Sequence, residues 1–351
     1  AGFQIYRPDG SKVEMTFTYP TPTTIDEFYT NAEGSLVTPE KLSFGKGYSI
    51  VEVQAPYGYV LDETPVYFDV TEDNSTEESG VTVVKVDKPN MAQKGTITVE
   101  KTGEVFFGAV YEIIAAEDII TPDGTVRNQK GEVVDTVTTD ENGTAVSREL
   151  YLGKYEVREI TAPHGMVLNP EPHCVELVYA GQNVAVTETA TSFENERQKV
   201  EISLVKSIEQ NEHFGIGNNG EMKNISFGLF AAEEIVSASG TSIPADGLIE
   251  IISPNEDGTA KIKTDLPFGS YYVQELATDS HYKFSDTKYP VTFAYVGQDT
   301  AVVKIAANDG KAIENDLIYG SVSGKKVDEN GSALGGALIG LFRTDDGEFT
   351  K

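Results

Sequence analysis

The stretch GTITVEK (95–101) decides how the rest of the chain is interpreted. In a β-strand, successive side chains point to opposite faces, so Ile97 and Val99 share one face with Lys101. The two aliphatic side chains predict that this face is turned towards a hydrophobic core. The third inward position is then occupied by a lysine, whose ammonium group is costly to bury without a partner.

This stretch belongs to a pattern that recurs along the chain, and such self-similarity indicates tandem domains. The lysine motif occurs as GTITVEK (95–101), VEISLVK (200–206) and GSVSGKK (320–326). Further matching stretches are AGFQIY (1–6), AVYEII (109–114), ISFGLF (225–230) and ALIGLF (337–342); YSIVEVQAPYGYVL (48–61), YEVREITAPHGMVL (155–168) and YYVQELATDSHYKF (271–284); and YAGQNVAV (179–186) with YVGQDTAV (295–302).

Short runs of Val, Ile, Tyr, Phe and Thr, separated by Gly, Asn, Asp and Pro turns, lie between these motifs. This pattern predicts an all-β chain of tandem Ig-like β-sandwich domains arranged end to end. The expected repeats are 1–93, which lacks its first strand; 94–197 and 198–317, which are complete; and 318–351, which holds about two strands of a fourth.

Composition excludes several classes of partner. The net charge of −29 over 351 residues argues against nucleic acid and anionic membrane surfaces. No apolar run reaches 18 residues, so membrane insertion is not expected. The single cysteine, Cys174, excludes an intramolecular disulfide framework and is predicted to be a small buried strand residue. Because Ala1 opens directly into a strand-like segment without a signal peptide, we expect an internal piece of a longer protein.

Two more polar residues occupy inward positions in each repeat. A glutamate is in phase with the apolar residues of the stretches YSIVE (48–52), YEVRE (155–159) and YYVQE (271–275). An asparagine is in phase with the apolar residues at the end of each repeat. Each asparagine lies 11 residues before the next lysine, although loops elsewhere vary in length. The residues are Glu52, Glu159 and Glu275; Asn90, Asn195 and Asn315; and Lys101, Lys206 and Lys326.

A lysine, a glutamate and an asparagine buried together can react. An apolar site favours the neutral amine, which is a nucleophile, and the neutral carboxylic acid. That acid could hydrogen-bond the asparagine carbonyl and move protons from the amine to the departing ammonia. The product would be an isopeptide bond made once, without cofactor or metal. The alternative is a satisfied polar network or a Lys–Glu ion pair; recurrence in phase and at fixed spacing favours the bond.

These motifs resemble the Cna B-type domain, also called the SpaA-like or prealbumin-like repeat, of Gram-positive surface adhesins and pilins. The resemblance covers essentially the whole chain and is strongest in residues 94–197. It implies an inverse Ig-like sandwich with a Lys–Asn isopeptide bond that a glutamate promotes. Carried over to this sequence, Lys101 would bond Asn195 with Glu159 assisting. In the next repeat Lys206 would bond Asn315 with Glu275 assisting.

The outer repeats depart from the family pattern. Glu52 and Asn90 have no lysine strand in their repeat, so no internal bond is expected there. Lys326 has no glutamate or asparagine; it is preferred over Lys325 because it is in phase with Val322. The family implies an extracellular, cell-wall-anchored location on a Gram-positive bacterium. No LPxTG-like sorting signal is present, so attachment to the cell wall would be encoded outside this chain.

The expected function is a structural stalk rather than an enzyme, stiffened by self-made cross-links. An alternative is a ligand-binding adhesin module, in which insertion 207–224 or 115–135 contacts host matrix protein or glycan. A secreted enzyme is disfavoured because no catalytic set recurs outside the self-reacting site. A further hypothesis joins Lys326 of one molecule to Glu52 and Asn90 of the next. The stretches DENG (140–143, 328–331) and NEDG (255–258) are interpreted as turns rather than calcium loops.

Overall fold

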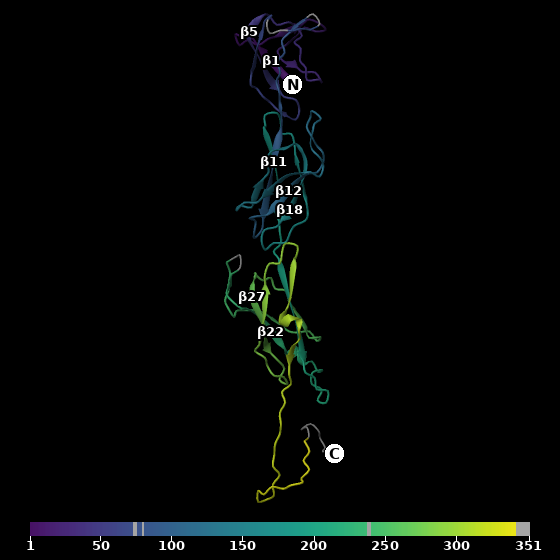
Figure 1. Ribbon diagram of the computed structural model, residues 1–351, viewed down its shortest axis with the longest axis vertical. Coiled ribbons are helices and arrows are strands. Elements are labelled where there is room, and N and C mark those ends of the chain that lie inside the picture. The colour runs from purple at the N-terminus through teal and green to yellow at the C-terminus, as the bar shows by residue number, and fades with distance from the viewer. Residues whose placement is uncertain (73–75, 79–80, 237–239, 342–351) are drawn as a thin grey trace. The chain divides into compact units, whose positions relative to one another are not determined.

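The computed structural model describes residues 1–72, 76–78, 81–236 and 240–341 (Figure 1). Strands account for almost all of its regular structure, which confirms the all-β prediction. The helical elements among these residues are two 3-10 turns, η1 (Glu221–Asn224) and η2 (Ala307–Gly310). Within the same ranges, no helix is long and apolar enough to cross a membrane. The chain divides into two compact units, 1–200 with 294–303, and 201–293 with 304–351.

The second repeat is a sandwich of two four-stranded sheets. In one sheet, β11 runs parallel to its neighbour β20, and Lys101 lies opposite Phe193. In the other, the antiparallel neighbours β12 and β18 are labelled in Figure 1. The first sheet contains β16 (Thr144–Val146), β11 (Lys94–Thr102), β17 (Leu150–Tyr151) and β20 (Val186–Glu194); the second contains β15 (Val133–Thr138), β12 (Val110–Ala115), β18 (Gly153–Thr161) and β19 (His173–Leu177).

The core of this repeat lies between the two sheets and follows from strict alternation along β11. Ile97 and Val99 are fully buried, whereas the intervening threonines are half-buried. Lys101 continues the buried face at 4% exposure, as the phase of GTITVEK predicts. Tyr111 of β12 and Phe193 of β20 meet across the core, with ring centroids 4.8 Å apart. Burying each such side chain stabilises the fold by about 1.5–3 kcal/mol.

The third repeat repeats this plan. Strands β22 and β27, labelled in Figure 1, pair in the same register as β12 and β18, so Phe227 lies opposite Glu275 as Tyr111 lies opposite Glu159. One sheet contains β26 (Thr259–Ile262), β21 (Lys199–Ile208), β29 (Val302–Ala306) and β30 (Ile313–Asn315); the other contains β25 (Leu248–Ile252), β22 (Ser226–Ala231), β27 (Gly269–Ala277) and β28 (Lys288–Phe293). Short hairpins follow β12 and β22, the second strands of the two repeats: β13 (Ile119–Ile120) with β14 (Val126–Asn128), and β23 (Ile235–Val236) with β24 (Ser242–Ile243).

The first repeat keeps the sheet that carries its glutamate. Its described residues include no strand equivalent to β11 or β21. The sheet has the order β4 (Phe28–Tyr29), β1 (Gly2–Tyr6), β5 (Gly45–Gln54) and β7 (Val66–Val70). Three small ribbons complete it: β2 (Met15–Phe17) with β3 (Thr23–Ile25), β8 (Thr76–Glu78) with β9 (Val81–Val83), and β6 (Tyr59–Val60) with β10 (Met91–Ala92).

The two strands expected after residue 317 are not formed in residues 318–341. This part of the chain has one isolated bridge, Val327 to Ala333, and most of its side chains are exposed. The prediction was wrong for a physical reason: an alternating pattern becomes a strand only when a neighbouring strand satisfies its backbone groups. The three acidic glycine-containing stretches do form turns, as predicted. In the first, Asp140 Oδ1 accepts hydrogen bonds from the Asn142 and Thr144 amides.

Candidate cross-linking sites

A tyrosine four residues before each glutamate fixes the orientation of the strand that carries it. The hydroxyl of Tyr155 donates to Tyr151 O (2.6 Å), and that of Tyr271 donates to Pro267 O (2.6 Å). Because residues four apart in a strand share a face, burial of the tyrosine turns the glutamate inward. Glu159 and Glu275 are each 2% exposed.

In the second repeat, Asn195 contacts Glu159, whereas Lys101 contacts backbone carbonyls near the ends of β11 and β20. Lys101 Nζ donates to Phe193 O and Thr102 O, each at 3.1 Å. The Asn195 amide nitrogen donates to Glu159 Oε2 (2.6 Å) and to Val167 O (2.5 Å). Asn195 Oδ1 is buried and has no hydrogen-bond partner among the described residues. The side-chain carbonyl of Asn195 therefore accepts no hydrogen bond from the described residues.

Glu159 has two further partners in the second repeat. The Tyr111 hydroxyl donates to Oε1 (3.1 Å), and the Asn169 backbone amide donates to Oε2 (2.8 Å). Burial, together with the neighbouring Glu159 carboxylate, raises the pKa of Tyr111, so its hydroxyl remains a donor at neutral pH. Tyr111 thus occupies the carboxylate oxygen that Asn195 does not contact.

In the third repeat, the lysine reaches the asparagine directly. Lys206 Nζ donates to Asn315 Oδ1 at 2.7 Å, as well as to Ile313 O and Ser207 O. The Asn315 amide nitrogen donates to both oxygens of Glu275 (2.9 and 3.1 Å) and to Thr278 Oγ1 (2.8 Å). All three reactive groups are 2% exposed. The amide is held at both ends, by the amine on its oxygen and by the carboxylate on its nitrogen.

This contact differs from the expected one, in which the carboxylic acid hydrogen-bonds the asparagine carbonyl. In both complete repeats it is the amide nitrogen that lies against the glutamate. A carboxylate can only accept hydrogen bonds, so it pairs with the amide nitrogen of the asparagine. The lysine amine donates, so it pairs with the amide oxygen. The glutamate is therefore placed beside the group that would leave as ammonia.

Burial lowers the pKa of both inward lysines. Desolvation is the largest cause; the nearby carboxylates act in the opposite direction. The pKa of Lys206 falls from 10.5 to about 8, and that of Lys101 also falls below its ordinary value. A substantial fraction of the Lys206 amine is then neutral at mildly alkaline pH.

The first repeat holds a half-site. Glu52 is fully buried, and its Oε2 accepts from the Asn90 amide nitrogen (2.7 Å) and the Asp62 backbone amide (3.1 Å). Its Oε1 has no partner among the described residues. Lys326, the lysine of the last segment, is exposed.

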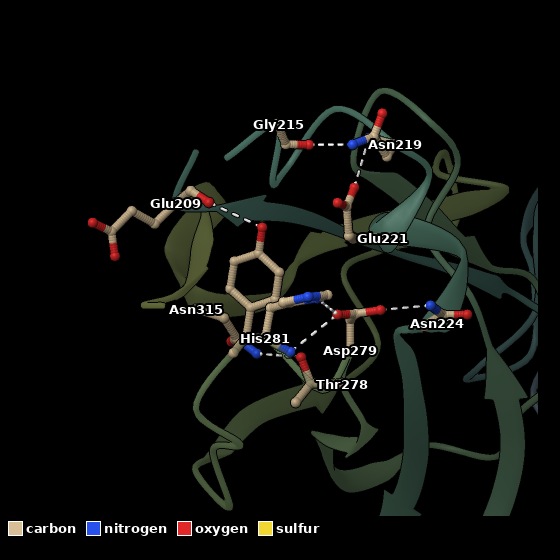
Figure 2. A network of polar contacts seen from close by, with 10 residues as sticks. Glu209, Gly215, Asn219, Glu221, Asn224, Thr278, Asp279, His281 and Asn315 are labelled. Atoms are coloured by element: carbon tan, nitrogen blue, oxygen red, sulfur yellow. Dashed lines mark hydrogen bonds and ion pairs between the residues drawn. The ribbon is translucent and has the colours of Figure 1, made fainter. Parts of the chain in front are cut away.

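The two ends of the insertion at 207–224 contact the rest of their own repeat (Figure 2). Asn224 donates to Asp279 Oδ2 (2.6 Å), and the Tyr282 hydroxyl donates to Glu209 O (3.0 Å). Asp279 also accepts hydrogen bonds from the His281 backbone amide and pairs with its ring Nδ1 (2.6 Å). These contacts surround the segment that carries Thr278, next to Asn315.

Sequence reasoning missed Tyr111 and Thr278. A signal for the first was present, because the strand motif carries tyrosine in AVYEII (109–114) and phenylalanine in ISFGLF (225–230). Thr278 replaces the alanine of the A-P-x-G turn, and its hydroxyl gains meaning only from the contact with Asn315. Cys174 was placed correctly on a strand, β19, but is exposed rather than buried.

The family model of the SpaA prealbumin-like fold domain matches three times, at residues 1–85, 95–191 and 215–311. These matches cover more than half of the chain, so the protein belongs to this family of prealbumin-like domains, as the motifs predicted. The three matches also confirm tandem domains of this fold.

Individual relatives are more distant. The trypsin-resistant surface T6 protein of Streptococcus pyogenes is 26% identical over 147 residues, which are 40% of this chain and 26% of that protein. The TIE protein of Bacillus anthracis is similar in structure, with a TM-score of 0.52 and 22% identity over 90% of this chain and 47% of that one. BcpA, the major pilin subunit of Bacillus cereus, gives a TM-score of 0.29 at 16% identity, over 90% of this chain and 94% of its own. The chain thus spans about a quarter of the first and half of the second.

Proposed function

We propose that this chain is a stalk segment of an extracellular Gram-positive surface adhesin or pilin, attached to the cell wall through regions outside it. Its second and third repeats are stiffened by self-made isopeptide bonds, Lys101–Asn195 and Lys206–Asn315, promoted by Glu159 and Glu275. The observation that carries the proposal is the third-repeat contact: a buried amine 2.7 Å from an amide oxygen whose nitrogen lies on a buried carboxylate.

The reaction is a transamidation that needs no outside reagent. The neutral Lys206 Nζ attacks Cγ of Asn315, and a bond forms between them. Glu275 takes a proton from the attacking amine and delivers it to Nδ2, so the Cγ–Nδ2 bond breaks and ammonia leaves. One amine and one amide are consumed, one amide and one ammonia are produced, and the glutamate is regenerated. Lys101, Asn195 and Glu159 follow the same scheme.

The position of the bonds suits a load-bearing segment. Lys101 lies near the end of β11, the first strand of its repeat, and Asn195 directly follows β20, the last strand. A pulling force would enter along β11, cross the covalent bridge and leave at Asn195. The residues between them would carry no load.

Intact mass of the denatured protein tests the proposal. The wild-type chain should be lighter than its sequence mass by two ammonia equivalents. Glu159→Gln and Glu275→Gln should each restore one equivalent, because the amide cannot shuttle protons as the carboxyl group does. Glu156→Gln is the matched control on the same strand as Glu159; Glu156 forms a surface ion pair with Arg158, and this variant should still be two ammonia equivalents lighter than its own sequence mass.

The full sequence mass in the wild type would contradict the proposal. Lys101 and Lys206 would then be hydrogen-bonded only, and the ligand-binding alternative would be tested next with glycan and matrix-protein arrays. Peptide mapping that joins Lys206 to a residue other than Asn315 would contradict the assigned pair.

A further inference from the structure

A buried glutamine follows each of the first two repeats and fixes a loop of the next one. Gln93, 1% exposed, donates from Nε2 to Gly181 O (2.9 Å) and Val184 O (2.5 Å), and its Oε1 accepts from the Ala180 amide (2.9 Å). All three partners lie in the loop that begins YAGQ (179–182). A single linker side chain therefore holds that loop in shape.

The same loop reaches back to the repeat that precedes it. Gln182 Oε1 accepts from the Ala55 amide (2.8 Å), and Gln182 O accepts from the Leu61 amide (2.9 Å). The ring of Tyr179 lies 4.7 Å from that of Tyr57. These partners flank the A-P-x-G turn of the first repeat, which contains Gly58. The Gly58 carbonyl in turn accepts from the Gln93 amide (2.9 Å).

This arrangement recurs around the second turn. Gln198 is fully buried and makes the contacts of Gln93, donating to Gly297 O (2.9 Å) and Thr300 O (2.7 Å) and accepting from the Val296 amide (3.1 Å). Residues 294–303 belong to the same compact unit as this turn.

Gln298 makes the contacts of Gln182. Its Oε1 accepts from the Ala162 amide (2.9 Å), its O accepts from the Leu168 amide (2.9 Å), and its Nε2 donates to Ile160 O (3.1 Å). The ring of His164 packs at a tilt against that of Tyr295, with centroids 4.7 Å apart. Tyr57 and Tyr179 pack in the same way.

We propose that the Y-x-G-Q loop is a docking element whose partner is the A-P-x-G turn of the preceding repeat, and that Gln182 and Gln298 lock these junctions. The side-chain oxygen of each glutamine accepts a hydrogen bond from the backbone amide of the turn alanine. Its backbone carbonyl accepts a second bond, from the amide three residues after the turn glycine. Two anchors on opposite sides of one turn resist both bending and twisting. The linker glutamines, Gln93 and Gln198, keep the docking loop in the shape that makes these contacts.

The third repeat has different residues at the turn and at the position of the linker glutamine. Thr278 and Asp279 replace the Ala-Pro of the turn, and Ile318 stands where the linker glutamine would be. The backbone contact persists, because the Ile318 amide donates to His281 O (2.8 Å), but the Ile318 side chain is 59% exposed. Asn224 of the insertion at 207–224 lies beside this turn and donates a hydrogen bond to Asp279 (Figure 2).

The inference does not depend on the isopeptide bonds, and a spin-label distance measurement tests it separately. Native Cys174 is exposed on β19 of the second repeat, and Tyr67, 73% exposed on β7 of the first repeat, is replaced with cysteine. Gln182→Met preserves side-chain length but removes the side-chain hydrogen bonds. It should broaden the distance distribution about twofold, because domain pairs without a firm interface move relative to each other. Gln129→Met is the control, since Gln129 is exposed in the second repeat and its backbone amide bonds to Glu132 rather than to the turn.

Amide exchange of the same proteins gives a second, local readout at both junctions. Gln182→Met should accelerate exchange at Ala55 about tenfold, the effect of losing one hydrogen bond, and Gln298→Met should do the same at Ala162. Unchanged protection at core residues Val99 and Val157 shows that the repeats remain folded. A distribution as narrow in Gln182→Met as in the parent, or equally broad in both, would overturn the proposed lock.

Discussion

The second and third repeats place the same three reactive residues in the same backbone frame, yet they arrange them differently. Asn315 meets Lys206 through its oxygen and Glu275 through its nitrogen. Asn195 meets Glu159 through its nitrogen, but its oxygen has no partner among the described residues. The difference begins with the residue opposite the glutamate, which is a tyrosine in one repeat and a phenylalanine in the other.

The comparison indicates that the competition for the glutamate oxygens decides how the asparagine is held. Tyr111 occupies Glu159 Oε1, so the Asn195 amide nitrogen uses Oε2 and turns its second hydrogen to Val167 O. Phe227 has no hydroxyl to donate to Glu275. The Asn315 amide nitrogen therefore contacts both oxygens of Glu275. In the third repeat the lysine amine contacts the asparagine oxygen, whereas in the second repeat that oxygen has no partner among the described residues.

The largest effect should come from removing the reacting amines. Lys206→Met and Lys101→Met should each lower the free energy of unfolding of their repeat by about 4.7 kcal/mol, the chain-entropy value for a loop of about 100 residues. Methionine also leaves the buried glutamate without its cationic neighbour, which is itself destabilising, so Glu159→Gln and Glu275→Gln, which keep the lysines, are measured beside these variants. Denaturant unfolding of each variant measures the change. A stability that is unchanged or raised in both variants would mean that no bond is lost.

The next largest effect should be the pH dependence of bond formation in the third repeat. Because burial lowers the pKa of Lys206 to about 8, the reactive neutral amine should increase as pH rises and level off above that value. The rate should therefore rise about 50-fold from pH 6 to pH 8. Newly synthesised chain, released from cell-free translation at low pH and shifted to each test pH, is followed by intact mass. A rate that continues to rise towards pH 10.5 would indicate an ordinary exposed lysine.

An exchange of Tyr111 and Phe227 should move each site towards the behaviour of the other. Tyr111→Phe frees one oxygen of Glu159 and should accelerate bond formation in the second repeat about tenfold, the equivalent of one hydrogen bond. Phe227→Tyr should slow the third repeat by a similar factor. The same mass measurement, resolved by repeat through peptide mapping, gives both rates. Tyr272→Phe is the control, because its hydroxyl donates to Asp246 Oδ1 rather than to the glutamate. If both exchanges leave the rates as they were, the opposing residue has no role in positioning.

The smallest effect should come from Thr278, which accepts one hydrogen bond from the Asn315 amide nitrogen. Thr278→Ala should slow bond formation in the third repeat about fivefold, and Thr278→Ser should restore it, because serine keeps the hydroxyl. The total yield of cross-linked protein should stay the same in both. Equal rates in the alanine and serine variants would show that this hydroxyl only satisfies a buried amide.

Much of this molecule could be predicted because strand alternation and repeat spacing are local properties of the chain. The period of two placed Lys101 and Glu159 on buried faces, and the structure confirms both positions. The prediction from alternation was wrong where the folded chain provides no partner for the strand. Residues 320–326 carry the same motif as β11 but have no neighbouring strand within the described part of the chain. Cys174 shows a related failure, since its strand was predicted but the face that it occupies was not.

The sequence by itself therefore determined the fold class, the tandem repeats and which lysine, glutamate and asparagine lie in each repeat. Those features follow from side-chain periodicity and fixed intervals along the chain. Only the tertiary structure decided which atoms of these residues meet, that Tyr111 competes for Glu159, and that Gln182 caps a turn 127 residues away. The physical reason is that a hydrogen bond depends on distances of a few tenths of an ångström between strands and loops, and such distances exist only once the sheets have packed.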